Sequence, residues 1–247
     1  MSAKTPQTFL DHLEELRWRL VRSLIAVTVG FLCCFGFAEE LFELLMRPVL
    51  AVLPPAGQQL HFTGLLEPFM VHLHVGVLGG LFVASPYIFH QVWGFVAPGL
   101  YHHERRYVVP FVLVSSLCFV GGALFGYLVV FPAGFRFFLS FTTESLVPVL
   151  TMGEYLSLST KLILVFGLVF ETPVIIFTLC GLGIVTPRKL LQSWRYVVVG
   201  ISIISAVLTP ADVLTMILMA IPLLILYFGS TLITMALLRR REPGEAA

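Results

Sequence analysis

Six long apolar runs, separated by short polar segments, constrain this chain more than any other feature of its sequence. A helix needs about 20 apolar residues to cross the roughly 30 Å hydrocarbon core of a bilayer. The six runs are 20–38, 69–95, 107–131, 161–182, 196–208 and 213–238. They are continuous, whereas the strands of a membrane barrel alternate polar and apolar residues. We therefore predict an all-α integral membrane protein, with one membrane domain over 1–247.

Composition excludes the soluble alternatives. Of the 247 residues, 58% are hydrophobic and 12% are charged, whereas about a quarter of a typical soluble domain is charged. The net charge of +1 gives no general attraction to nucleic acid. The first 22 residues hold three acids and no short apolar core, so we expect no cleaved signal and a retained N-terminus.

Basic residues set the expected orientation. Six spans place both termini on one side of the membrane, and twelve of the fifteen Lys and Arg lie on that side. Short loops rich in Lys and Arg stay in the cytoplasm, so we expect both termini to be cytoplasmic. The twelve are Lys4, Arg17, Arg19, Arg22, Arg105, Arg106, Arg188, Lys189, Arg195, Arg239, Arg240 and Arg241.

The fifth run is too short for an ordinary crossing. Its residues 196–208 reach only about 20 Å at the usual rise of a helix. Three explanations are open: the membrane thins there, the outward turn 209–212 lies below the outer surface, or the boundary is misplaced by one helical turn.

Glu171 stands in the middle of the fourth run, where a charged group is costly. Pro173 follows two residues later and is expected to bend the helix, because it removes one backbone hydrogen bond. An acid beside a kink favours a water-filled cavity, an ion path or a polar contact with a partner helix. The alternative is an acid paired with a hydroxyl inside the bundle.

The segment before the first run is amphipathic. Its apolar residues are spaced by 4, 3 and 4, and its charged residues by 4, 4 and 3, as two faces of one helix require. We predict a helix over about 9–19 that lies on the cytoplasmic surface, with Glu15 and Arg19 forming an i,i+4 pair. The two faces are Phe9, Leu13, Leu16 and Leu20, and Asp11, Glu15, Arg19 and Arg22.

The first cytoplasmic loop holds a single acid, Glu104. Trp93, Phe95 and Tyr101 suit a membrane interface. Glu104 either forms a local salt bridge to its arginine neighbours or joins Glu15 in holding a cationic peptide.

Metal and enzyme sites are not predicted. Cys33, Cys34, Cys118 and Cys180 lie in apolar stretches without ligand spacing, and we interpret them as buried apolar side chains. No hydrolase or phosphate-binding motif is present. We expect no cofactor and no enzymatic activity.

Several motifs, in order along nearly the whole chain, resemble the TatC family. The first is the run from His12 to Leu20, HLEELRWRL. Others are Ser85-Pro86, QVW at 91–93 with Phe95, PGLY at 98–101 and ERR at 104–106. FG at 166–167, FETP at 170–173 and LTPADV at 208–213 complete the set. One departure is His74, where many relatives have Lys.

This resemblance implies a receptor for signal peptides that carry two consecutive arginines. Such a receptor works with the single-span subunits TatA and TatB, and with several copies of itself, to pass folded proteins across the bacterial inner membrane. The proton-motive force drives that export. The implied fold is six tilted helices in a cupped bundle, with short fifth and sixth spans.

The resemblance also implies roles for particular residues. Glu15 and Glu104 would receive the arginine pair, and Glu171 would line the concave face that contacts partners. A polar edge near Tyr196 and Thr209 would be the TatB site. The remaining expected residues are His12, Arg17 and Arg105 at the peptide site, Pro173 and Phe95 on the partner face, and Pro48, Pro86, Pro210 and Asp212 in structural turns.

A different class of function is the alternative. Glu171 would be the coupling acid of a proton-coupled secondary transporter. Such transporters often contain internal repeats, and no repeat is visible in this sequence.

Overall fold

The computed structural model describes residues 9–53, 60–96, 108–141, 151–208 and 213–239. Those ranges are helical apart from turns and one isolated bridge between His61 and Thr151. The helices are α1 (Phe9–Phe35), α2 (Ala38–Leu50), α3 (Glu67–Val96), α4 (Val108–Phe125), the π-helix η4 (Gly126–Val130), α5 (Phe131–Leu139), α6 (Met152–Val169), α7 (Thr172–Gly181), α8 (Pro187–Gln192), α9 (Trp194–Leu208) and α10 (Val213–Arg239). Five helical segments of these ranges are long and apolar enough to cross a membrane, and Trp194–Val207 is a shorter apolar helix. The predicted all-α class is confirmed.

These helices form two compact units. The first comprises Met1–Glu43 and Phe69–Ser116, and the second Leu44–Pro68 and Leu117–Ala247. The boundary runs through α2 and α4. A single membrane domain over the whole chain stays a prediction.

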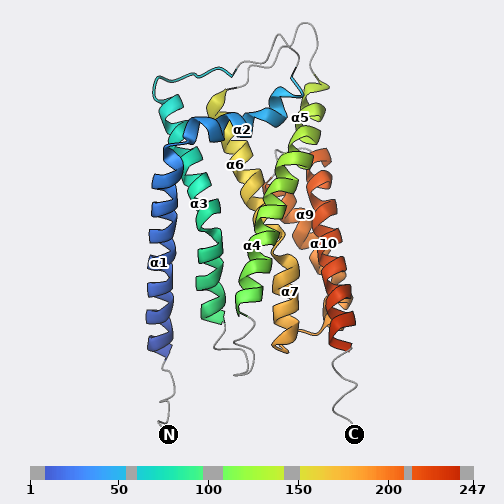
Figure 1. Cartoon of the computed structure of the whole chain (residues 1–247). Helices are drawn as coiled ribbons and strands as arrows, with labels where there is room; N and C mark the ends of the chain where they lie inside the picture. The colour runs from blue at the N-terminus through green and yellow to red at the C-terminus, as the bar shows by residue number, and fades with distance from the viewer. Residues whose placement is uncertain (1–8, 54–59, 97–107, 142–150, 209–212, 240–247) are drawn as a thin grey trace, which may run out of the picture. The chain divides into compact units, whose positions relative to one another are not determined.

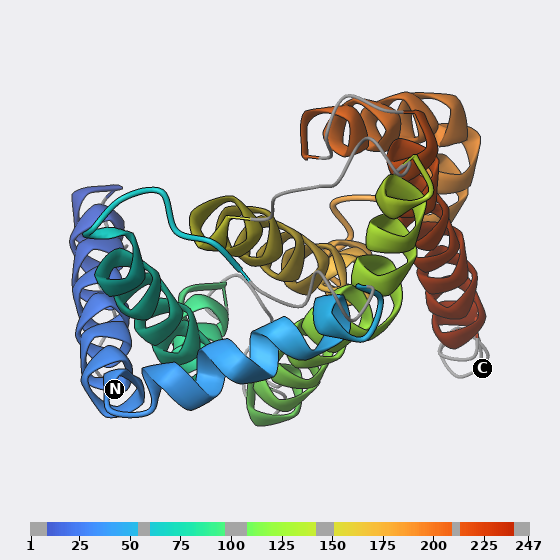
Figure 2. The same ribbon diagram turned by 90° about the horizontal axis from the view of Figure 1, so that it is seen from above.

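In the first unit, α1 and α3 lie side by side (Figure 1 and Figure 2). Two glycines, Gly30 and Gly80, lie at their contact. A Cβ on Gly30 would lie 2.6 Å from the carbonyl oxygen of Gly80. A Cβ on Gly80 would lie 2.4 Å from the backbone nitrogen of Phe31. Small residues let membrane helices approach closely, so this pair fixes the contact between α1 and α3.

The amphipathic segment and the first span form one helix, so the predicted separate surface helix is wrong. No glycine or proline interrupts the sequence between Phe9 and Val29, and α1 is continuous through it. Its apolar residues Leu13, Leu16 and Leu20 are exposed in the isolated chain. On the charged face, Glu15 and Arg19 are partly buried, whereas Asp11 and Arg22 are exposed.

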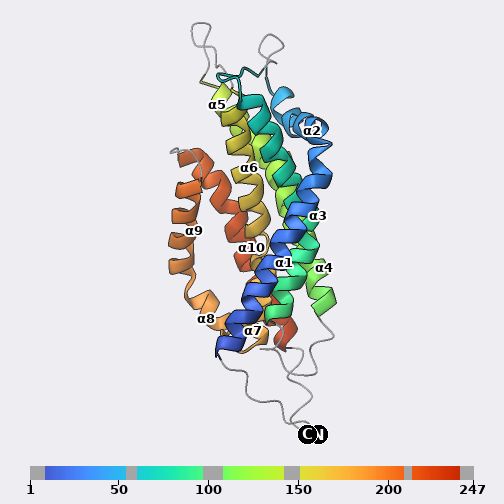
Figure 3. The ribbon, with the colours of Figure 1, turned by 90° about the vertical axis from the view of Figure 1, so that its left-hand side faces the viewer.

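In the second unit, α7 and α10 share a small core. Ile176, Cys180 and Tyr227 are buried together, and side chains from α8 and α9 pack against them. The Tyr227 hydroxyl donates a 3.1 Å hydrogen bond to the carbonyl oxygen of Leu190 at α8. Figure 3 shows α8 as a short step between α7 and α9, with α9 beside α10.

The third and fourth apolar segments are longer than predicted. The third continues past Pro132 to Leu139, because the Phe131 N–H donates to the Gly126 carbonyl in a π-helical turn that accommodates the proline. The fourth begins at Met152, where the Thr151 side chain accepts a hydrogen bond from Glu154 N–H. It is interrupted at Phe170 and Glu171, so the predicted distortion near Pro173 is confirmed.

The fifth span is short and the sixth is not. The 15 residues of α9 measure about 22 Å at 1.5 Å per residue, which confirms the shortness read from the sequence. α10 has 27 residues, so the expected shortness of the sixth span is wrong for its helix. The apolar run simply continues as helix through Pro222.

Pro48 and Pro86 lie inside α2 and α3, so their assignment to turns is wrong. A proline in a helix leaves the carbonyl four residues earlier without its partner. Ser85 donates its hydroxyl to the freed carbonyl of Phe82 at 2.7 Å, which keeps α3 intact through Pro86. The other two expected turn residues, Pro210 and Asp212, are outside the described ranges.

Candidate functional site

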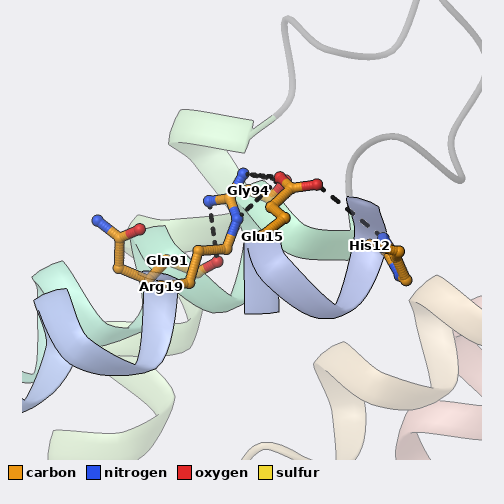
Figure 4. A network of polar contacts seen from close by, with 5 residues as sticks. All are labelled: His12, Glu15, Arg19, Gln91 and Gly94. Carbon is orange, nitrogen blue, oxygen red and sulfur yellow. Dashed lines mark hydrogen bonds and ion pairs between the residues drawn. The ribbon is translucent and has the colours of Figure 1, made fainter. Parts of the chain in front are cut away.

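An ion pair stands on the inward face of α1, near its start. Arg19 donates to Glu15 Oε1 from two nitrogens, at 2.6 Å from Nη2 and at 3.0 Å from Nε (Figure 4). The two residues are one helical turn apart, so their side chains share a face. Both are partly buried, at 21% and 28% side-chain exposure. The predicted i,i+4 pair is confirmed.

Arg19 also joins α1 to the end of α3. Its Nη2 donates to the carbonyl oxygen of Gly94 at 3.0 Å and its Nη1 to that of Gln91 at 3.3 Å. Gly94 is one of the last four residues of α3, whose carbonyls lack helical partners and carry partial negative charge, so a guanidinium is a favourable neighbour. A Cβ on Gly94 would lie 2.3 Å from Arg19 Nη1, so a side chain at this position would have to displace the guanidinium.

The second oxygen of Glu15 faces an aromatic pair. His12 Nδ1 lies 3.9 Å from Glu15 Oε2, an ion pair only when the imidazole is protonated. The His12 ring stacks on Phe95 with centroids 4.3 Å apart and planes 17° apart. No hydrogen bond reaches Oε2 from any part of the chain that the structure describes. The arrangement therefore offers a carboxylate oxygen beside a flat aromatic surface.

The other residues expected at the peptide site are not part of this cluster as described. Arg17 is on α1 and exposed. Glu104 and Arg105 lie outside the described residues. Glu15, His12 and Phe95 are thus the members that the structure brings together, and Phe95 contacts His12 although it was assigned to the partner face.

The residues expected at the partner face belong to the second unit, apart from Phe95. Glu171 is 6% exposed and occupies the interruption between α6 and α7. Pro173 stands at the start of α7, where the ring costs no helical hydrogen bond. Tyr196 is 82% exposed near the start of α9, and Thr209 lies outside the described ranges.

Two partners of Arg19 escaped the sequence reasoning. The carbonyls of Gln91 and Gly94 are 72 and 75 residues away along the chain. Backbone oxygens carry no residue-type signal, and only the glycine at 94, next to an aromatic pair, marks a close approach. Across the described ranges, no group of three or more His, Cys, Asp or Glu is placed to hold a metal ion.

Known proteins similar to this chain include TatC proteins. The family model described as Sec-independent protein translocase protein (TatC) matches residues 11–222. A TatC protein of Desulforapulum autotrophicum is 44% identical over 89% of this chain and 81% of its own length. A TatC protein of Escherichia coli is 40% identical over 92% of this chain and 88% of its own.

A solved structure shares the fold as well. It is described as the crystal structure of the twin arginine translocase receptor TatC, and it superposes with a TM-score of 0.82 at 38% identity. The match covers 93% of this chain and 100% of that one. This chain is therefore a multi-pass inner-membrane transport component rather than an enzyme, and it belongs to the TatC family of Sec-independent protein translocase proteins.

Proposed function

We propose that this chain is the signal-peptide receptor and core subunit of a twin-arginine translocase. It binds the paired arginines of a signal peptide and nucleates assembly with TatA and TatB for export driven by the proton-motive force. The observation that carries this proposal is Glu15, whose carboxylate is held by Arg19 with one oxygen left facing His12 and Phe95.

The chemistry of this cluster suits arginine. A guanidinium is planar, donates two parallel hydrogen bonds to a carboxylate and stacks on aromatic rings. The ammonium of lysine is a point charge and reproduces none of these features. Glu104 is the proposed second carboxylate, and Arg17 and Arg105 complete the set assigned to the peptide site from their motifs.

Orientation and partners follow from the same proposal. Members of this family act with other Tat subunits. We assign both termini and the peptide site to the cytoplasm, where twelve of the fifteen Lys and Arg would lie. Glu171, Pro173, Tyr196 and Thr209 are assigned to contacts with TatA and TatB in the bilayer, and several copies of the chain act in one complex.

Peptide binding to the purified full chain in detergent tests the receptor role. A fluorescent signal peptide with Arg-Arg is compared with its Lys-Lys variant, on wild type and on Glu15→Gln and Glu104→Gln. Removing one half of a desolvated charge pair costs about 2–4 kcal/mol, so we expect roughly 30- to 1000-fold weaker Arg-Arg binding in each variant. Glu14→Gln is the matched control, because Glu14 is an exposed neighbour of the same charge. Equal affinity of wild type and both variants would overturn the proposal.

The alternative, a proton-coupled secondary transporter using Glu171, receives no support from the similar proteins described above. Small-solute uptake into proteoliposomes by this chain alone, without TatA or TatB, would favour it instead.

A further inference from the structure

Arg19 presents to Glu15 the same chemical group that the proposed ligand carries. Its guanidinium already donates two hydrogen bonds to Oε1, the shorter at 2.6 Å. A receptor carboxylate in this state is electrically neutralised by its own chain. A second guanidinium added beside the first would bring two positive charges onto one carboxylate, and that repulsion weakens binding.

We propose that Arg19 is an internal occupant of the peptide site, and that an arginine of the signal peptide binds Glu15 by displacing it. This inference rests on the proposed function, because it assumes that Glu15 receives the peptide. It assigns to Arg19 a role as a specificity-determining residue for the receptor.

The other hydrogen bonds of Arg19 lower the free-energy cost of its displacement from Glu15. The carbonyls of Gln91 and Gly94 hold the guanidinium independently of Glu15, at 3.3 and 3.0 Å. When Glu15 turns to a new partner, Arg19 keeps both of these bonds and its charge stays beside the end of α3, where the helix dipole favours it. The N–H donors that faced Glu15 then need new hydrogen-bond acceptors. Because the Arg19 side chain is 21% exposed, water can supply them.

Exchange of one guanidinium for another discriminates between arginine and lysine. A peptide arginine restores to Glu15 every hydrogen bond that Arg19 withdraws, and it can add one to Oε2, which has no hydrogen bond within the described residues. A lysine ammonium cannot span both oxygens as a planar fork, so it replaces the lost contacts incompletely. Arg19 thus weakens the binding of every cationic peptide to Glu15, and it weakens that of a lysine peptide most.

The experiment compares Arg-Arg and Lys-Lys signal peptides on the full chain in detergent, in wild type and in Arg19→Gln. Removing Arg19 from the site is expected to strengthen the binding of both peptides, and that of Lys-Lys more. The ratio of the Lys-Lys Kd to the Arg-Arg Kd is therefore expected to fall at least about threefold. Arg22→Gln is the matched control. It removes the same charge from an exposed position of α1, three residues away, and is expected to leave the ratio unchanged.

Arg19→Lys provides a second variant that keeps the charge and loses the fork. It is expected to lower the ratio less than Arg19→Gln, and it decides the question alone where Arg19→Gln fails to fold. Weaker Arg-Arg binding in either variant, or an unchanged ratio, would overturn the displacement and leave Arg19 as a residue that merely orients Glu15.

Failure of this inference differs from failure of the proposed function. Loss of binding in Glu15→Gln together with an unchanged ratio in the Arg19 variants would reject the displacement alone. Unchanged binding in Glu15→Gln would reject the receptor site itself.

Discussion

The hydroxyl of Tyr127 donates a hydrogen bond to the carbonyl of Leu44, the carbonyl that Pro48 leaves without a helical partner. Proline has no N–H, so the bond that would normally run from residue 48 to residue 44 is missing from α2. Tyr155 makes a similar contact with the neighbouring carbonyl of Leu45. Two tyrosine hydroxyls therefore tie the middle of α2 to η4 and α6.

Replacing Tyr127 by Phe is expected to destabilise the protein by about 1 kcal/mol, because the Leu44 carbonyl loses its donor while the ring is kept. Thermal unfolding in detergent measures the loss. Tyr87→Phe is the control, since Tyr87 is 43% exposed and its ring, not its hydroxyl, makes the described contact. Equal melting temperatures for both variants and wild type would contradict the expectation.

A second background isolates the role of Pro48. In Pro48→Ala the backbone N–H of residue 48 is restored and can donate to Leu44 itself. Tyr127→Phe is then expected to cost less stability than it does in the natural background. The measurement is a double-mutant cycle from the four melting curves, and an identical loss in both backgrounds would show that Pro48 and Tyr127 are not coupled.

Gly122 permits the close approach of α4 and α6. A Cβ at this position would lie 2.3 Å from the carbonyl oxygen of Phe166 and 2.7 Å from Cβ of Phe170, which is part of the interruption between α6 and α7. Gly122→Ala is expected to cost at least about 2 kcal/mol, because backbone must move to relieve the clash.

Gly121 supplies the matched control for this substitution. A Cβ there meets no atom within 4 Å, and alanine favours a helix over glycine by up to about 1 kcal/mol. Gly121→Ala is therefore expected to match or exceed wild type in the same thermal unfolding assay. Comparable losses in the two neighbours would mean that helix flexibility, and not the contact with Phe166, explains the effect.

Glu67 connects the segment before α3 to the start of α6. Its Oε2 accepts the N–H groups of Thr63 at 2.6 Å and Gly64 at 3.2 Å, and its Oε1 accepts that of Gly153 at 2.7 Å. In Glu67→Gln one oxygen becomes an NH₂ donor, so one side of this bridge loses its acceptor.

Hydrogen exchange reports that loss directly. Amides in the peptides containing Thr63 and Gly64, or in the peptide containing Gly153, are expected to exchange faster in Glu67→Gln than in wild type. Glu154→Gln makes the same chemical change on an exposed neighbour of Gly153. Exchange that is unaltered in Glu67→Gln, or equally raised in Glu154→Gln, would exclude the bridge.

The apolar runs were predictable because hydropathy and length alone decide which segments can span a membrane. The short helix α2 was not, since its 13 residues mix acids with apolar side chains and contain Pro48. Helix ends at prolines were misjudged for one reason: side-chain hydroxyls and a π-turn satisfy the backbone groups that proline frees, and neither leaves a mark in hydropathy.

The candidate site, too, was predictable from the sequence only in part. Glu15 and Arg19 are one helical turn apart, and that spacing predicts their ion pair. The contacts of Arg19 with α3 depend on how two helices pack, which the glycines at 30 and 80 determine. Spacing within one segment carries no information about that packing.

A substitution at Glu171 is expected to weaken assembly with partner subunits without weakening peptide binding. Glu171 is 6% exposed at the interruption between α6 and α7. A buried acid within a membrane span is energetically unfavourable, and such acids commonly have a function. Glu171→Gln keeps the size of the side chain and removes its ability to carry charge. We expect it to leave the affinity for an Arg-Arg peptide within about twofold of wild type, because no residue of the peptide cluster is changed.

Assembly with TatA and TatB is expected to fall several-fold in the same variant, measured as the yield of site-specific crosslinks in membranes. Glu171→Asp serves as the control that keeps the charge. Its crosslinking is expected to lie between those of Glu171→Gln and wild type. Crosslink yields equal to wild type in Glu171→Gln would remove Glu171 from the partner contacts, whereas a parallel loss of peptide affinity would show that the two functions share this residue.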